Sequence, residues 1–178
     1  MQLPQDLNPP TRRNWSNGVY FSYEAGQPST HGGGPGGPRI VRVGTHREQD
    51  RLLLRLGYHW NGPNGNSVLR RHIQGALANL LPQPRLPTVG GYIQTSLSFV
   101  RIMIPLPADR RHFETILIST INQCPVCGPA RPWLGASANN PKIANGKLWN
   151  VQALNGPMIN QAELARLQAF ATSTPPGP

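Results

Sequence analysis

Clusters of glycine and proline divide this chain into short segments and so limit what it can fold into. The 178 residues include 19 Gly and 20 Pro, most densely in the run GQPSTHGGGPGGP at residues 26–38. Proline removes a backbone donor and glycine is costly to order, so helices and strands end at such clusters. We expect a flexible N-terminus at 1–14, a single domain at 15–152 with a flexible loop at 26–38, a C-terminal helix within 153–171 and a flexible tail at 172–178.

The segments between these clusters have the patterns of strands and helices. Alternating β-branched and aromatic residues predict strands at 18–23 (GVYFSY) and 39–44 (RIVRVG), and a buried strand at 96–106. Thr45 and Glu48 match the S/T-x-x-E capping pattern, which predicts a helix over 49–60. Apolar spacing predicts further helices, at 67–80, 109–122 and 160–170. The order of elements indicates a small mixed α/β (α+β) fold, a short and largely antiparallel sheet flanked by helices.

The charge of the chain points to a polyanionic partner. Seventeen basic residues, all but Lys142 and Lys147 of them arginine, face only seven acids, for a net charge of +10. Arginine binds phosphate bidentately and is weakly hydrated, so nucleic acid is the expected partner. A GC-rich genome would explain the preference for arginine over lysine but not the shortage of acids. No apolar run approaches the ~18 residues of a membrane span, so we expect no membrane partner and, without an apolar leader, a cytoplasmic location.

Basic residues on two of the predicted helices are candidate contacts to nucleic acid. Arg51, Arg55 and His59 recur every four residues and so lie on one line of the helix at 49–60. For Arg51 the favoured alternative is a solvated arginine that covers apolar surface. Two further candidates on the next helix are Arg70 and Arg71.

Glu114 lies at the border of the apolar face of the helix at 109–122, on one line with Asn122. A carboxylate there is a candidate ligand for a metal ion, and its alternative is an ordinary helical ion pair with Arg110 or Arg111.

The order of these residues resembles the GIY-YIG nuclease family. Gly18-Val19-Tyr20 and Arg42-Val43-Gly44 stand for the family's two strand motifs, followed by Arg55 on a helix and by Glu114. The first motif matches with one conservative change, whereas Arg42 replaces the tyrosine of the second. The resemblance covers residues 17–152 and is strongest to a branch of uncharacterised stand-alone bacterial proteins, which shares the runs RPWLG (131–135) and GKLWNV (146–151).

The resemblance implies a metal-dependent endonuclease that hydrolyses phosphodiester bonds of DNA. Tyr20 would be the base or position the water, Arg55 would hold the phosphate, and Glu114 would bind Mg²⁺ or Mn²⁺. Metal-assisted cleavage needs these three parts: a base, a cation and an oxygen ligand. Small stand-alone members suggest a role in restriction, defence or mobile-element biology, with DNA preferred over RNA. A palindromic double-strand cutter would be a homodimer.

Other positions have two interpretations each. Arg42 would add positive charge near the phosphate but cannot replace a proton-transfer role of the absent tyrosine. His46 and His59 are candidates to activate water or protonate the leaving oxygen, because imidazole titrates near neutral pH. Asn122 matches the family's late asparagine or caps its helix, and Tyr20 alone could be an aromatic residue that fills the sheet.

Two competing functions follow from the same residues. The replacement by Arg42 favours a catalytically inactive nucleic-acid-binding module of the same fold, and the charge alone would also suit a basic structural protein. Cys124 and Cys127 resemble half of a zinc site, but no second CxxC exists. His112, another histidine or a second subunit would have to complete the four ligands. Zinc is therefore not the expected cofactor.

Overall fold

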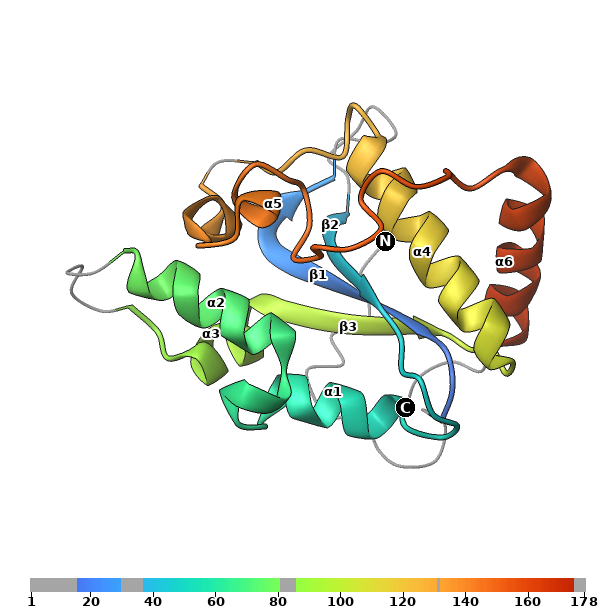
Figure 1. Ribbon diagram of the computed structural model, residues 1–178, viewed down its shortest axis with the longest axis horizontal. Coiled ribbons are helices and arrows are strands. Elements are labelled where there is room, and N and C mark those ends of the chain that lie inside the picture. The colour runs from blue at the N-terminus through green and yellow to red at the C-terminus, as the bar shows by residue number, and fades with distance from the viewer. Residues whose placement is uncertain (1–15, 30–36, 81–85, 131, 175–178) are drawn as a thin grey trace.

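The computed structural model describes residues 16–29, 37–80, 86–130 and 132–174, and their core is a three-stranded antiparallel sheet (Figure 1). The strands are β1 (Val19–Pro28), β2 (Pro38–Gly44) and β3 (Leu97–Ile102), in the order β2-β1-β3. The helices are α1 (Leu52–Trp60), α2 (Val68–Ala78), α3 (Val89–Ser96), α4 (Pro107–Gln123), α5 (Pro141–Ala144) and α6 (Gln161–Ser173), with 3-10 turns η1 (Asn64–Asn66) and η2 (Leu134–Ser137). The expected mixed α/β class, with an antiparallel sheet flanked by helices, is confirmed.

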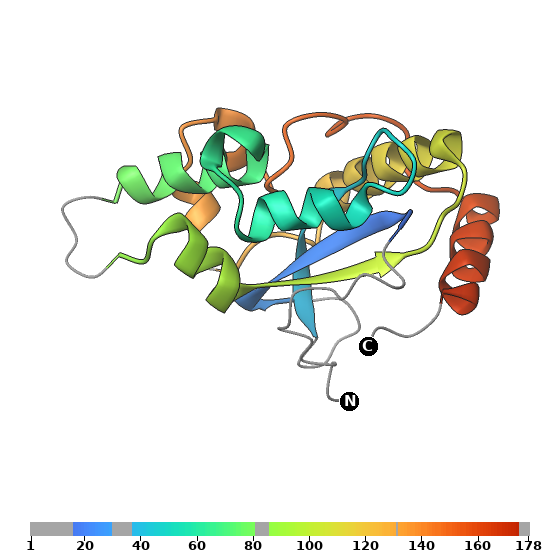
Figure 2. The ribbon, with the colours of Figure 1, turned by 90° about the horizontal axis from the view of Figure 1, so that it is seen from below.

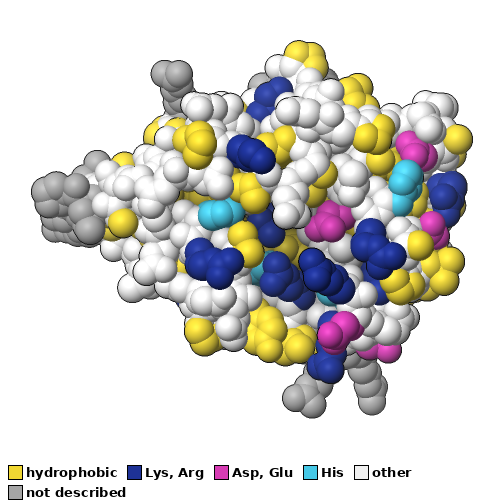
Figure 3. Space-filling view, viewed as in Figure 1, with side chains coloured by type: hydrophobic (Ala, Val, Ile, Leu, Met, Phe, Trp, Pro, Cys, Tyr) yellow, Lys and Arg dark blue, Asp and Glu magenta, His cyan; other side chains and the backbone are white. Residues whose placement is uncertain are grey.

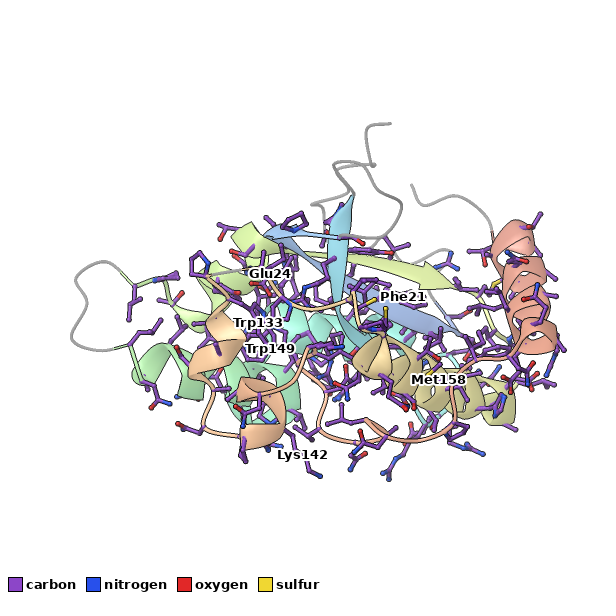
Figure 4. The ribbon with its side chains drawn as sticks, turned by 90° about the horizontal axis from the view of Figure 1, so that it is seen from above. Phe21, Glu24, Trp133, Lys142, Trp149 and Met158 are labelled. Atoms are coloured by element: carbon purple, nitrogen blue, oxygen red, sulfur yellow. The ribbon has the colours of Figure 1, made fainter. Side chains whose placement is uncertain are left out.

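Helices cover both faces of the sheet, and the alternation of β1 determines which residue meets which helix. Val19 and Phe21 belong to the apolar cluster formed with α4, whereas Tyr20 packs against Leu52 and Leu56 of α1. Figures 2 and 4 view the sheet from opposite sides, with α1 in front of it in the first and α4 in the second. Odd-numbered and even-numbered positions of β1 thus face different helices: Val19 and Phe21 face α4, and Tyr20 faces α1.

The outer edge of β2 is covered by a C-terminal segment without regular structure. The Trp149 N–H donates to the Val41 carbonyl at 2.7 Å. The Asn150 side chain accepts from the Val43 N–H at 3.1 Å and donates to the Val43 carbonyl at 2.8 Å, so one amide satisfies both backbone groups. Unpaired groups on an edge strand require partners, and residues 149–150 supply them here.

The predicted cap at Thr45 is wrong. Helix α1 begins at Leu52, after an irregular segment in which Asp50 has a positive φ of 57°. The Thr45 hydroxyl instead donates to the Gly18 carbonyl at 2.7 Å, and its N–H donates to Glu114. Glu48 pairs with Arg51 at 3.3 Å. Tertiary partners therefore displace the local capping pattern.

Other boundaries also differ from the sequence prediction. Helix α3 lies in a segment for which no helix was predicted; Thr88 caps it by accepting the Gly91 N–H at 3.0 Å. Strand β3 ends at Ile102, well before the expected end of the strand, and β1 continues into the predicted loop as far as Pro28. Of the segments predicted to be flexible (1–14, 26–38 and 172–178), residues 1–14, 30–36 and 175–178 lie outside the described residues, β2 begins within the predicted loop at Pro38, and α6 continues into the predicted tail as far as Ser173. The predicted helix starts at Ser67 and near Asn160 are confirmed, and at each start the N-cap side chain accepts a backbone N–H.

Candidate active site

Tyr20, Arg42 and His59, three residues singled out from the sequence, are in direct contact. The Tyr20 hydroxyl lies 2.7 Å from Nε2 of His59, and Nε of Arg42 donates to the same oxygen at 3.1 Å. They come from β1, β2 and α1, so only the folded sheet and its covering helix bring them together. Arg42 Nη1 donates to the Trp149 carbonyl at 2.8 Å, which fixes the other branch of the guanidinium.

Gly44 makes room for the Tyr20 ring. It is paired with Tyr20 across the β1–β2 ladder. A Cβ at Gly44 would stand 2.4 Å from both Cζ and Oη of Tyr20, too close for any side chain. The glycine of the second strand motif is therefore required by the tyrosine of the first. The result is a ring with no exposed surface, in contact with Phe99 at a centroid distance of 6.1 Å.

Ser67 continues the chain of polar contacts behind His59. Its hydroxyl lies 2.6 Å from Nδ1 of His59 and also accepts the Arg70 N–H at 3.2 Å, as the cap of α2. If Nδ1 carries the proton and donates to Ser67, Nε2 is free to accept from Tyr20. Burial, together with the positive charges of Arg42, Arg55 and Arg70, lowers the pKa of His59 well below its usual value. His59 is thus neutral near pH 7, and its Nε2 can accept the hydrogen bond of the Tyr20 hydroxyl.

Glu114 reaches the same end of the sheet from α4. Its Oε1 accepts the Thr45 N–H at 3.1 Å, just beyond the end of β2. Burial raises the pKa of Glu114, and the charge of Arg42, the Thr45 hydrogen bond and the charge of Arg55 oppose that shift. The two arginines therefore act on this carboxylate as well as on His59. The alternative pairing with Arg110 does not form, because the Arg110 guanidinium donates to Gln49 and to backbone carbonyls.

Glu114 has the chemistry of a ligand for Mg²⁺ or Mn²⁺. Its Oε2 has no hydrogen bond to any described residue. Magnesium is typically held by one or two carboxylates and keeps several waters, so a single half-buried glutamate suits it. Within the described ranges no three His, Cys, Asp or Glu side chains gather into a group that could hold a metal. His112, the suggested partner of Cys124 and Cys127 for zinc, instead contacts Glu163 at 2.7 Å.

Exposure divides the site into two layers. Tyr20 and His59 have no exposed surface, and Arg42 is 7% exposed, whereas Arg55 and Glu114 are half-buried. Of the described hydrogen bonds, none involves the Arg55 guanidinium. The outer layer can meet a phosphate directly, and the Tyr20–His59–Ser67 chain lies beneath it.

Three of the predicted contact residues have other partners. Arg70 is 9% exposed and donates to the carbonyls of His59 and Trp60 at 3.1 Å, so it holds the end of α1 and is not available to nucleic acid. Asn122 donates to the Leu154 carbonyl at 3.0 Å and secures the C-terminal segment; it does not cap its helix, whose C-cap is Cys124. Arg51 is the exposed first residue before α1, as the solvated alternative anticipates.

His46 belongs to a separate network. Its Nε2 contacts Oδ1 of Asn17 at 3.0 Å, and the Asn17 amide donates to Asp50 at 2.6 Å. Burial and the charge of Arg110 lower the pKa of His46 to about 4. His46 thus braces the segment between β2 and α1 as a neutral side chain, with no described hydrogen bond to Tyr20, His59 or Glu114. Arg71 remains exposed, with Nη1 on the Gly65 carbonyl at 3.1 Å.

The sequence pattern points to most residues of the candidate site but not to the residues that hold them in place. Ser67 was expected only to start a helix, and Trp149 and Asn150 were noted only as part of a run shared with a family. The run GKLWNV could have indicated Trp149 and Asn150. A tryptophan and an asparagine in a segment with neither a helical nor a strand pattern point to a tertiary role.

Basic side chains gather on the surface around this site. Figure 3 shows Lys and Arg side chains in a band across the face seen in Figure 1, with an acidic side chain beside it.

None of the helices in the described part of the chain combines the length and apolar character that crossing a membrane requires. Compared with models of protein families, with curated proteins and with solved structures, the chain has no match in any of the three.

Proposed function

We propose that this protein is a metal-dependent endonuclease of the GIY-YIG type that hydrolyses phosphodiester bonds of DNA. The observation that carries the proposal is the convergence of Tyr20, Arg42 and His59 in one hydrogen-bonded cluster, with Glu114 and Arg55 on its exposed side. These residues come from four different elements. A cluster of this composition at a strand end suits phosphoryl chemistry better than it suits stability, because buried charged groups are expensive.

The two layers of the site have different roles in this proposal. Arg55 would bind the phosphate, and the buried charge of Arg42 beneath it would help to stabilise the charge that develops on the phosphate oxygens. Glu114 would hold Mg²⁺, which would polarise the phosphate and lower the pKa of bound water. Beneath them, neutral His59 would accept the hydrogen bond of the Tyr20 hydroxyl, while the Arg42 N–H donates to the same oxygen, so that the hydroxyl is held in one orientation.

Cleavage of plasmid DNA tests the proposal. Supercoiled plasmid, linear duplex and structured RNA would each be incubated with Mg²⁺, Mn²⁺ or EDTA. Glu114→Gln keeps the acceptor for Thr45 and loses the charge, so we expect a rate about 100- to 1000-fold lower, in line with the several kcal/mol that a metal supplies. Arg55→Ala should lose activity similarly. The matched controls are Glu48→Gln and Arg166→Ala, which remove an exposed acid and an exposed arginine elsewhere.

The burial of Tyr20 and His59 favours a second candidate, a nucleic-acid-binding module that does not cut. With no exposed surface, neither residue meets a substrate without movement of its neighbours. Arg42 occupies the position of the family's second tyrosine and cannot transfer a proton at neutral pH. Binding that persists in Glu114→Gln, with no cleavage by the wild type under any condition, would establish this candidate and reject the nuclease.

A further inference from the structure

We propose that Trp149 and Asn150, anchored by Glu24, form a positioning device: they hold the Arg42 guanidinium in hydrogen-bonding position against the Tyr20 hydroxyl. The inference rests on the proposed function, in which the charge of Arg42 lies near the phosphate. It assigns a role to the run GKLWNV, which the chemistry at the site does not otherwise use.

The device acts on Arg42 from two directions. The Trp149 carbonyl accepts from Nη1 of Arg42 at 2.8 Å, while Nε of the same guanidinium donates to Tyr20 at 3.1 Å. A planar guanidinium held at two of its nitrogens has little freedom to rotate. The position of the Trp149 backbone therefore determines how Arg42 meets Tyr20.

Asn150 fixes that backbone against β2. Its amide makes both hydrogen bonds to Val43, at 2.8 and 3.1 Å, and Trp149 N–H bonds Val41 at 2.7 Å. Val41 and Val43 flank Arg42 in β2. The segment is thus paired to the same strand from which Arg42 projects, on either side of it.

Glu24 anchors the Trp149 side chain. Its Oε2 accepts the indole N–H groups of Trp133 and Trp149, each at 3.3 Å, and its Oε1 accepts from Tyr92 at 2.5 Å. In Figure 4, Glu24 on β1 and the two tryptophans of the C-terminal segment lie side by side. Glu24 is 4% exposed; burial raises its pKa, and the hydrogen bonds from the three donors oppose that shift. A buried carboxylate that binds both indoles holds the segment at a defined distance from β1.

Exchange of the Arg42 Hε proton with solvent measures the positioning directly. In ¹⁵N-labelled wild type, this proton bonds a buried oxygen and should exchange slowly. Asn150→Ala removes both bonds to Val43, so we expect exchange at least about tenfold faster. Asn79→Ala is the control, because it removes the hydrogen bonds of another asparagine side chain, to Ser137 in η2 and to Asn139, and Asn79 has no described hydrogen bond to Arg42. Wild type in urea, brought to the stability of each variant, corrects for global unfolding.

If Asn150→Ala does not fold, a second pair of variants tests the proposed positioning of Arg42. Trp149→Phe and Trp133→Phe each remove one indole N–H from the same Glu24 oxygen at the same distance. The proposal expects faster Arg42 Hε exchange in the Trp149 variant than in the Trp133 variant, since only Trp149 bonds Arg42 through its backbone. Equal exchange within both pairs would overturn it.

Cleavage measured in parallel separates this inference from the proposed function. If both hold, Asn150→Ala lowers kcat and makes Arg42 Hε exchange faster, and Asn79→Ala changes neither. If the wild type cuts no substrate but Arg42 still exchanges faster in Asn150→Ala, the nuclease is rejected and the positioning stands. An active Asn150→Ala enzyme with unaltered Arg42 exchange would support the nuclease and reject the positioning.

Discussion

Tyr20 and Gly44 form a complementary pair, a large ring on one strand over an absent side chain on the next. They face each other in the β1–β2 register, and the Tyr20 hydroxyl passes where a Cβ of residue 44 would be. The ring can therefore reach both His59 and Arg42 from inside the sheet. One glycine thus decides whether the polar chain of the site can form.

Replacement of Gly44 by alanine should displace the tyrosine. A methyl group 2.4 Å from Oη of Tyr20 forces the ring or the strand to move, so we expect a loss of about 1–3 kcal/mol in the free energy of unfolding. The contact with His59 should be lost too, and with it any cleavage activity. Denaturant unfolding and the plasmid assay measure the two effects.

Gly57→Ala is the control for this substitution. Gly57 lies within α1, and a Cβ there would meet nothing within 4 Å. Alanine should stabilise the helix by about 0.5–1 kcal/mol without changing the site. Equal effects of the two substitutions would contradict the close approach of Tyr20 to Gly44.

One hydroxyl group, that of Ser67, connects helices α1 and α2. Ser67 caps α2 through the Arg70 N–H and at the same time contacts Nδ1 of His59 near the end of α1. The cap of one helix thereby orients the histidine of another. Arg70, predicted to bind nucleic acid, reinforces this junction by donating to the His59 carbonyl.

Removal of this hydroxyl should cost both stability and function. Ser67→Ala is expected to lower the free energy of unfolding by about 1 kcal/mol through the lost cap, and by about 1–3 kcal/mol more because Nδ1 of buried His59 is left without its partner. Because His59 also loses its Nδ1 partner, activity should fall by about 10- to 100-fold, as for other partners that orient a reacting group.

Thr88→Ala separates the two effects of the serine substitution. Thr88 caps α3 through the Gly91 N–H at 3.0 Å and makes no described hydrogen bond to His59. The stability loss should be only the ~1 kcal/mol of a lost cap, with cleavage unchanged. Equal loss of cleavage in the two variants would mean that Ser67 acts only as a cap.

For the whole molecule, the net charge of +10 should govern affinity for nucleic acid. Binding that releases counterions from phosphates weakens steeply with salt. We expect the logarithm of the association constant to fall linearly with the logarithm of the salt concentration, and Arg55→Ala to reduce the magnitude of that slope by about 0.9, one phosphate contact. Fluorescence anisotropy with a labelled duplex in EDTA measures it without cleavage.

An arginine outside the site provides the reference for the salt dependence. Arg166 on α6 pairs with Asp109 at 3.1 Å and lies over the Phe113 ring. Its replacement by alanine should leave the slope nearly unchanged. A reduction as large as that of Arg55→Ala would show that the protein binds polyanions through its overall charge, as a basic structural protein would.

The sequence by itself determined the class of fold, most elements and the residues of the site. Alternating and helical spacing are local properties, so β1, β2, α2, α4 and α6 are found without knowledge of the tertiary structure. Tyr20, Arg42, Arg55 and Glu114 were singled out because their order resembles a known family. The same local reasoning failed at Thr45, where Gly18 and Glu114 provide partners that a capping pattern cannot anticipate.

Only the tertiary structure decided which of these residues meet and which are exposed. Tyr20 and His59 are 39 residues apart, and Arg42 and Trp149 are 107 apart. Contacts at such separations depend on strand register and on how helices cover the sheet, which periodicity does not encode. Burial likewise gives structural partners to Arg70, a candidate contact, and to His46, a candidate catalytic residue, because buried polar groups must find partners inside the protein.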